Sequence, residues 1–173
     1  MNTFKQSKKY LVFLIIATVL ALAINVFIIL QSCLNANQST ESSGLVVNLF
    51  KAIINAFHKD AIDEDNIGTF THVIRKLVGH FGLYACSGLL TSWALYMWIK
   101  PLSWFKPYIY LIIDLSFGFL FSLLTEFIQL FTPGRSGEFI DSLIDFSGYL
   151  VGTLITLLIL FILFKQRTKK EQE

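Results

Sequence analysis

The chain has 173 residues, of which 54% are hydrophobic, and its mean hydropathy is +0.62. This composition excludes an ordinary soluble domain of the same length and indicates a membrane protein. The formal net charge of +2 excludes no class of partner by itself. Cys33 follows one apolar segment and Cys86 lies inside another, which disfavours a disulfide framework.

Four apolar segments are long enough to cross a bilayer, because a helix needs roughly 20 apolar residues to span the hydrocarbon. These predicted spans are residues 10–30, 77–99, 108–131 and 143–164. They leave no room for a separate soluble domain. We therefore predict a single domain, residues 1–173, with an all-α fold: an integral membrane four-helix bundle.

Basic residues indicate the orientation of the chain, because short cytoplasmic segments collect lysine and arginine. They precede the first span, separate the second from the third, and follow the fourth: Lys5, Lys8, Lys9, Lys100, Lys106, Lys165, Arg167, Lys169 and Lys170. In a four-span chain these positions fall on one side. We expect both termini to be cytoplasmic and the turn after the third span to face outward. Topology thus explains the basic residues, and no nucleic-acid partner is expected.

The first span resembles a signal peptide, since basic residues lead into an apolar run. The run is about twice the usual length of such a segment, so we expect an uncleaved membrane anchor. An alternative is lipidation of Cys33, because LQSC at residues 30–33 loosely resembles a lipobox. Gln31 and the long apolar run disfavour that alternative.

The segment 32–76 connects the first two spans on the predicted outer side. Within it, LVVNLFKAIINAF places apolar residues at helical spacing: Val46, Leu49, Phe50, Ile53, Ile54 and Phe57. This pattern predicts an external amphipathic helix. The helix either packs against the spans or lies on the membrane surface.

Polar and small residues recur at steps of three or four in each of the last three spans, which places them on helix faces directed at the bundle interior. The second span carries His80, Tyr84 and Gly88; the third Asp114, Gly118, Ser122, Thr125, Glu126 and Gln129; the fourth Asp141, Asp145, Gly148 and Gly152. Gly148 and Gly152 allow close helix contact, within one chain or between two copies in an oligomer.

The outer ends of these stripes converge on one predicted binding site. Its candidate ligand-binding residues are His80, Tyr84, Glu126, Gln129, Arg135, Asp141 and Asp145. An ionisable side chain at membrane depth needs compensation. Arg135 can supply it by pairing with Glu126 or Asp141, which would clasp two helices together. Alternatively, Arg135 and His80 face an anionic or sugar-bearing headgroup.

A catalytic interpretation uses the same residues, with His80 as general base and Glu126 and Asp141 orienting it or activating water. The three histidines show no metal-ligand spacing, so neither a metal nor a cofactor is expected. Transport is disfavoured, because only Asp114 extends the polar stripe inward.

The motifs of this region resemble those of the VanZ-like family of small membrane proteins, whose best-known member is linked to teicoplanin resistance in Gram-positive bacteria. The resemblance covers residues 76–152. The matching residues are His80, Phe81 and Tyr84 (HFxxY); Thr125, Glu126 and Gln129 (TExxQ); Pro133, Gly134 and Arg135 (PGR); and Asp141, Gly148 and Gly152 on the last helix.

The resemblance implies a non-enzymatic protein of the cell membrane that binds an amphiphile or envelope lipid at the outward polar site. It also implies low-level resistance to teicoplanin and similar lipoglycopeptides. The expected partners are membrane lipids and either a lipoglycopeptide or a cell-wall lipid precursor. The alternative function is a small membrane hydrolase or transferase acting on lipid-linked cell-wall material.

One position departs from the family pattern, since Asp145 stands where the family usually has asparagine. A carboxylate at that depth must be protonated or find a cation. Arg135 and His80 are the candidate cations that the sequence places nearest to Asp145.

Overall fold

The computed structural model describes residues 2–59, 61–102 and 106–170, with side chains for 8–59, 61–102 and 106–166. The side chains of Lys5, Arg167, Lys169 and Lys170, which enter the prediction of orientation, lie outside the described residues. The helices are α1 (Asn2–Ser32), α2 (Ala36–Phe57), α3 (Ile67–Ile74), the π-helix η1 (Arg75–Gly82), α4 (Leu83–Ile99), α5 (Pro107–Leu130) and α6 (Phe139–Lys170). The described chain contains no strand, so the all-α prediction is confirmed.

Three helices are long and apolar enough to cross a membrane. They contain the segments Lys8–Ser32, Pro107–Leu130 and Phe139–Gln166, which correspond to the first, third and fourth predicted spans. The second predicted span, 77–99, is also helical, but η1 and α4 share it and α4 alone has 17 residues. It is therefore shorter as a regular α-helix than the roughly 20 residues that a bilayer requires.

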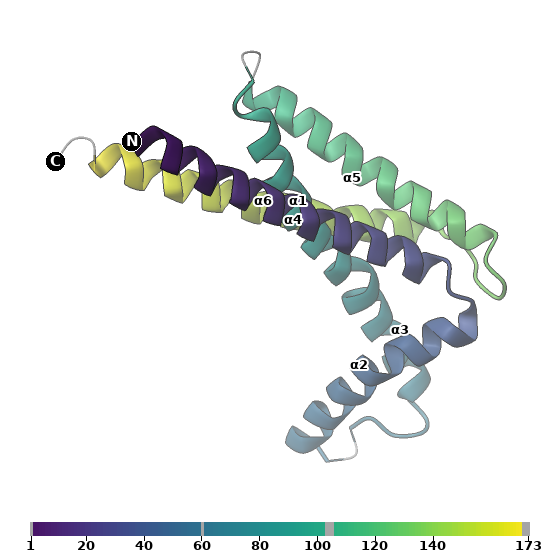
Figure 1. Ribbon diagram of the computed structural model, residues 1–173. Helices are drawn as coiled ribbons and strands as arrows, with labels where there is room; N and C mark the ends of the chain where they lie inside the picture. Colours follow the sequence, from purple (N-terminus) through teal and green to yellow (C-terminus); the bar gives the residue numbers. More distant parts are fainter. Residues whose placement is uncertain (1, 60, 103–105, 171–173) are drawn as a thin grey trace.

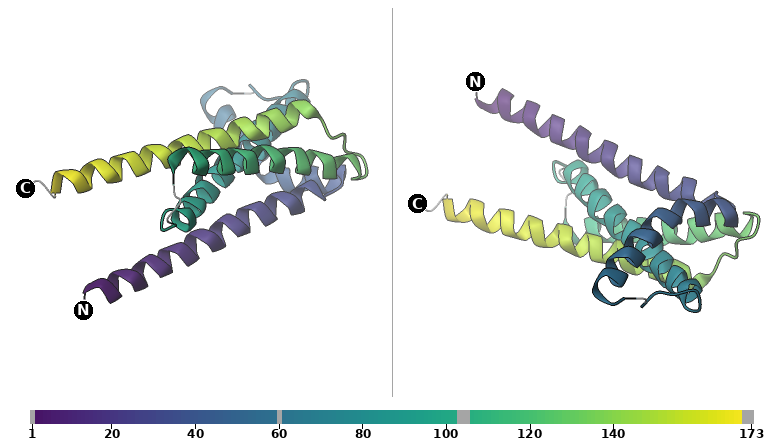
Figure 2. Two further views of the ribbon diagram at one scale, coloured as in Figure 1. Left: turned by 90° about the horizontal axis from the view of Figure 1, so that it is seen from above. Right: turned by 90° about the horizontal axis from the view of Figure 1, so that it is seen from below.

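The helix α4 lies between α1 and α6, and α5 packs against α6 (Figure 1). At one end of the molecule the Tyr10 hydroxyl donates to the Met97 carbonyl, and the Lys100 ammonium lies 4.7 Å from the centre of the Phe164 ring. The beginning of α1 and the end of α6 lie toward this end, and the turn between α5 and α6 lies at the other (Figure 2). The basic residues beside Tyr10, Met97 and Phe164 therefore share one end of the structure.

The turn between α5 and α6 is fixed to the end of α1, where the Thr132 hydroxyl donates to the Ser32 carbonyl at 3.2 Å. Its Arg135 N–H donates to the Thr132 carbonyl at 3.1 Å, and Gly134 has φ of 73°. Proline followed by glycine with positive φ is typical of a type II turn. The Ala36 N–H donates to the Pro133 carbonyl at 3.2 Å, so the same turn also holds the start of α2.

The external helix begins earlier than predicted, at Ala36, because the side chains of Asn35 and Gln38 form a capping box. Its predicted apolar face is divided between two environments. Val46, Phe50 and Ile54 are half-buried against the rest of the protein, and Leu49, Ile53 and Phe57 are exposed. The helix therefore packs against the other helices and also presents an apolar flank.

Glycines set the close contact between α6 and the η1–α4 segment. A Cβ on Gly152 would lie 2.1 Å from the Ala85 carbonyl oxygen, and one on Gly148 would lie 2.2 Å from that of Phe81. Backbone atoms that close leave no room for a larger residue. Both glycines thus make their close contacts within one chain here, and an oligomer formed through them stays a prediction.

We predict that Gly152→Ala lowers the free energy of unfolding by about 1 to 3 kcal/mol, as expected for overpacking against rigid backbone. Thermal unfolding of the purified protein in detergent measures the effect. Gly44→Ala is the matched control, because a Cβ at Gly44 meets nothing within 4 Å. Equal stability of the two variants would contradict the packing described.

Candidate functional site

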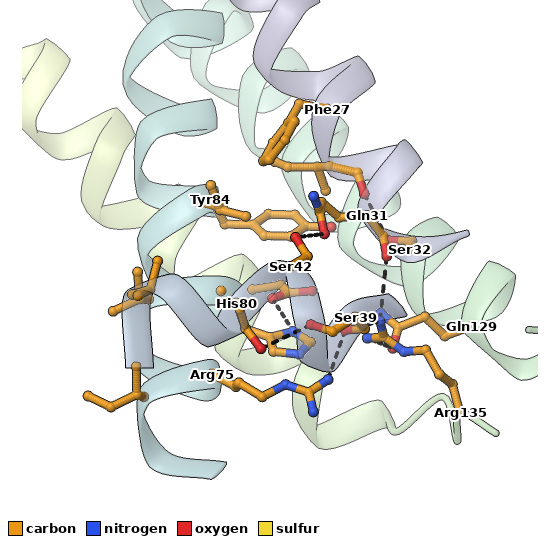
Figure 3. Close-up of a pocket in the computed structure, with 18 residues that line it drawn as sticks. Phe27, Gln31, Ser32, Ser39, Ser42, Arg75, His80, Tyr84, Gln129 and Arg135 are labelled. Carbon is orange, nitrogen blue, oxygen red and sulfur yellow. Dashed lines mark hydrogen bonds and ion pairs between the residues drawn. The ribbon is translucent and has the colours of Figure 1, made fainter. Parts of the chain in front are cut away.

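A cavity of about 210 Å³ lies between the end of α1, the helix α2 and the π-helix η1 (Figure 3). One part of its wall is apolar and includes Phe27, Ile28, Val46, Val78 and Leu83. The other part is polar, with several serines and the following predicted site residues: His80, Tyr84, Gln129, Arg135 and Asp145. The cavity is therefore amphipathic.

A largely buried group of polar side chains joins three helical elements at the site. His80 Nδ1 of η1 lies 3.0 Å from Asp145 Oδ1 of α6 and 3.8 Å from Glu126 Oε1 of α5. Asp145 is 1% exposed and Glu126 is 4% exposed, so both carboxyl groups are removed from bulk water. Of the two cations expected near Asp145, His80 is the one in contact.

Both oxygens of the Glu126 carboxylate accept hydrogen bonds from α5 and the following segment. The Gln129 amide donates to Oε1 at 2.7 Å, and the Glu138 backbone N–H donates to Oε2 at 3.1 Å. These donors fix the orientation of the carboxylate. Gln129 and Glu126 are therefore brought together as the sequence stripe predicts.

Two arginines converge on the Ser39 hydroxyl at the polar side of the cavity (Figure 3). Arg75 Nη2 lies 2.9 Å and Arg135 Nη1 lies 3.0 Å from Ser39 Oγ. Arg135 Nη2 also donates to Gln129 Oε1 at 2.6 Å. Burial lowers the pKa of Arg135, and the like charge of Arg75 lowers it further. An arginine nevertheless stays protonated at neutral pH.

The expected pairing of Arg135 with Glu126 or Asp141 is not what the structure shows. Arg135 bonds Gln129, Ser39 and the Gln31 carbonyl, so it ties the α5–α6 turn to α1 and α2. The external helix α2 supplies the competing acceptor. Its position could not be predicted from the spacing of residues in the spans.

Asp141 belongs to a separate ion pair at the edge of the site. Lys76 Nζ lies 2.6 Å from Asp141 Oδ1 and 4.0 Å from Glu138 Oε2. The hydrogen bond to Asp141 raises the pKa of the Lys76 ammonium. Sequence analysis missed Lys76, Arg75 and Ser39. Lys76 lies four residues before His80, on the same helix face, which is the signal that could have identified it.

Tyr84 lies next to His80 along the wall of the cavity. Its hydroxyl forms a hydrogen bond with the Thr125 hydroxyl, and its ring lines the cavity. Asp114 lies in a different layer, where it accepts from Ser92 at 2.6 Å and from Tyr149 at 2.9 Å. Asp114 thus stabilises helix packing and does not extend the site.

His80 occupies a π-helix of eight residues, Arg75–Gly82. Helices of this type are rare and usually appear as single turns inside α-helices. They are frequently found at functional sites. The π-helix changes the register between α3 and α4. Its presence was not predicted from the hydrophobic pattern.

Three side chains of the site offer atoms of the kinds that bind metal ions. His80 Nδ1 and one carboxylate oxygen each of Glu126 and Asp145 all lie within 4.8 Å of one another. No metal was expected from the sequence, because the three histidines are neither paired on one helix face nor joined by cysteines. His80, Glu126 and Asp145 come from three different helical elements.

We predict that Lys76 and Asp141 stabilise the fold jointly by about 1 kcal/mol, as expected for a partly exposed ion pair. A double-mutant cycle with Lys76→Met and Asp141→Asn measures this coupling by thermal unfolding. The coupling should be equal at pH 7 and pH 9, because a lysine whose pKa rises on folding loses its stabilising effect only above its unfolded value of about 10.4.

The control for this cycle replaces Asp141→Asn by Glu138→Gln. The distance from Lys76 Nζ to Glu138 is 4.0 Å, so a smaller coupling is expected. A coupling of Lys76 to Glu138 as large as its coupling to Asp141 would show that the 2.6 Å contact with Asp141 adds no stability of its own.

The comparison with known families agrees with these features. The family model described as VanZ/LLP1 matches residues 10–163, which cover nearly all of the three apolar helical segments and all the residues of the site. Searches among curated proteins and among solved structures found no match. The resemblance inferred from the motifs is thus confirmed, and with three apolar helices it supports a multi-pass membrane protein. The chain belongs to the VanZ/LLP1 family.

Proposed function

We propose that this protein binds an anionic amphiphile or envelope lipid in the cavity and thereby confers low-level resistance to teicoplanin and similar lipoglycopeptides. The convergence of Arg75 and Arg135 at the polar side of a cavity with an apolar wall carries the proposal. Guanidinium groups are suited to carboxylate and phosphate oxygens. An apolar wall beside them is suited to a hydrocarbon chain.

The Ser39 hydroxyl supports an anionic headgroup in particular. It accepts from Arg75 and Arg135 at once, although these two groups carry like charges and repel each other. A neutral hydroxyl compensates that repulsion weakly. A phosphate or carboxylate oxygen in its place would form charge-assisted hydrogen bonds, which are about twice as strong as neutral ones.

The proposed orientation places both termini in the cytoplasm and the cavity at the outer leaflet. Its support is the shared location of the basic flanks of α1, α4 and α6, together with the preference of lysine and arginine for the cytoplasmic side. This orientation requires η1 and α4 together to cross the membrane, in addition to the three long apolar helices. A lipid-tailed antibiotic also concentrates in the outer leaflet, where the cavity would meet it.

One observation favours an enzyme as the alternative, a membrane hydrolase or transferase acting on lipid-linked cell-wall material. His80 lines the cavity and its Nδ1 lies 3.0 Å from the buried Asp145. A carboxylate in that position can orient an imidazole that acts as a general base. Asp141 has no part in this mechanism, because it forms an ion pair with Lys76.

We predict that a sensitive Gram-positive host expressing the wild-type chain shows reduced susceptibility to teicoplanin and unchanged susceptibility to vancomycin. Arg135→Ala and Arg75→Ala should each abolish the protection. Losing one charge-assisted hydrogen bond weakens binding about 10- to 100-fold. The amount of each variant in the membrane is measured alongside by immunoblot.

Lys59→Ala is the matched control, since Lys59 is exposed and does not line the cavity. It removes a positive charge from the same connecting segment and should retain full protection. Protection that persists in both arginine variants at normal membrane levels would overturn the proposal. Loss of protection in His80→Gln alone, with both arginine variants active, would favour the enzyme.

A further inference from the structure

We propose that His80, Glu126 and Asp145 form a binding site for one divalent transition-metal ion beside the cavity. Their candidate ligand atoms are His80 Nδ1 and one oxygen from each carboxylate, and all lie within 4.8 Å of one another. A tetrahedral ion bound at about 2.0 to 2.2 Å from each ligand holds its ligand atoms about 3.3 to 3.6 Å apart. The two histidine distances, 3.0 and 3.8 Å, lie on either side of that spacing, so small side-chain movements would close the site around an ion.

The charges at this position also favour a divalent cation over the single histidine. Glu126 and Asp145 are buried, and within the described part of the chain neither forms an ion pair with lysine or arginine. His80 Nδ1 carries at most one hydrogen, which can be directed at only one of the two carboxylates. A divalent ion neutralises both carboxylates together, and His80 then binds it as a neutral imidazole.

The surrounding donors match those of an outer shell that orients metal ligands. Gln129 Nε2 donates to Glu126 Oε1 at 2.7 Å, and the Glu138 backbone N–H donates to Oε2 at 3.1 Å. Such contacts hold a carboxylate ligand in a fixed direction. The close contact of Gly148 with Phe81, the neighbour of His80, brings the imidazole onto α6.

The ligand types limit the metal that fits. One imidazole nitrogen and two carboxylate oxygens suit Zn²⁺ or Mn²⁺, whereas Cu⁺ prefers sulfur ligands. Three protein ligands leave a position open for water or another ligand. His80 and Asp145 both line the cavity, so the open position faces the space that Arg75 and Arg135 border. The metal site stands on its own geometry and does not require the proposed function.

The test uses the full chain purified in detergent with an affinity tag that contains no histidine. Metals are removed with a chelator, and Zn²⁺ and Mn²⁺ are titrated separately, by calorimetry for Zn²⁺ and by electron paramagnetic resonance for Mn²⁺. We expect saturable binding of one ion per chain. Asp145→Asn and Glu126→Gln should weaken it by about 100-fold or more, since even an outer-shell change costs about 10- to 100-fold.

The control variant is Asp141→Asn, because Asp141 is a nearby acid that pairs with Lys76 and lies outside the three ligands. It should bind the metal with wild-type affinity. A second readout is the unfolding temperature, which the metal should raise in the wild type and not in Asp145→Asn. If Asp145→Asn does not fold, Glu126→Gln and His80→Gln supply the same comparison.

Two results would overturn the proposal. One is the absence of saturable binding of both ions to the folded wild-type chain. The other is binding that Asp145→Asn and Glu126→Gln leave unchanged, which would place the ion elsewhere on the protein or in the detergent micelle.

Discussion

The burial of Glu126 and Asp145 is the constraint on which the rest of this structure depends. Two carboxylates almost out of contact with water, at 4% and 1% exposure, are costly unless cations and donors compensate them. The chain meets that cost with His80, Gln129 and a backbone N–H. Because these groups come from separate elements, the compensation also determines how η1, α5 and α6 pack.

Glycines make this packing possible. Gly148 and Gly152 let α6 approach the backbone of Phe81 and Ala85, and the same approach carries His80 to Asp145. Helix packing and the polar site are thus one arrangement. A larger residue at either glycine would disturb both the stability of the fold and the geometry of the site.

The connecting helix α2 positions the basic side of the cavity, which consists of the two arginines around Ser39. The type II turn at Gly134 directs Arg135 toward α2, whose Ser39 accepts from Arg135 and from Arg75. This arrangement leaves the acids to His80 and Lys76. The two arginines therefore lie near the acids of the site without forming ion pairs with them. This leaves the arginines able to bind an anion.

Sequence reasoning could predict the features that repeat along one helix. The apolar runs predicted four spans, three of which are long apolar helices in the structure. The polar steps of three and four placed Glu126, Gln129 and Asp145 on interior faces, where they are buried, because each pattern depends on local geometry. The motifs around His80 and Arg135 predicted the family.

Contacts that depend on distant segments could not be predicted in this way. The partners of Arg135 and Asp141 depend on where α2 and Lys76 lie, and no local pattern fixes those positions. The hydrophobic pattern did not predict the π-helix around His80. The capping box of Asn35 and Gln38 is different, since it is readable in the sequence and would have placed the start of α2.

The measurement that tests the account most directly is cysteine labelling in intact cells, because the proposed function requires the cavity to face outward. Cys33 and Cys86 are both exposed, so the starting variant carries alanine at both positions. Glu138→Cys places an exposed thiol in the connection between α5 and α6, and Pro101→Cys places one in the connection between α4 and α5. A membrane-impermeant maleimide is expected to label position 138 in intact cells and position 101 only after permeabilisation. The reverse pattern would contradict an outward-facing cavity.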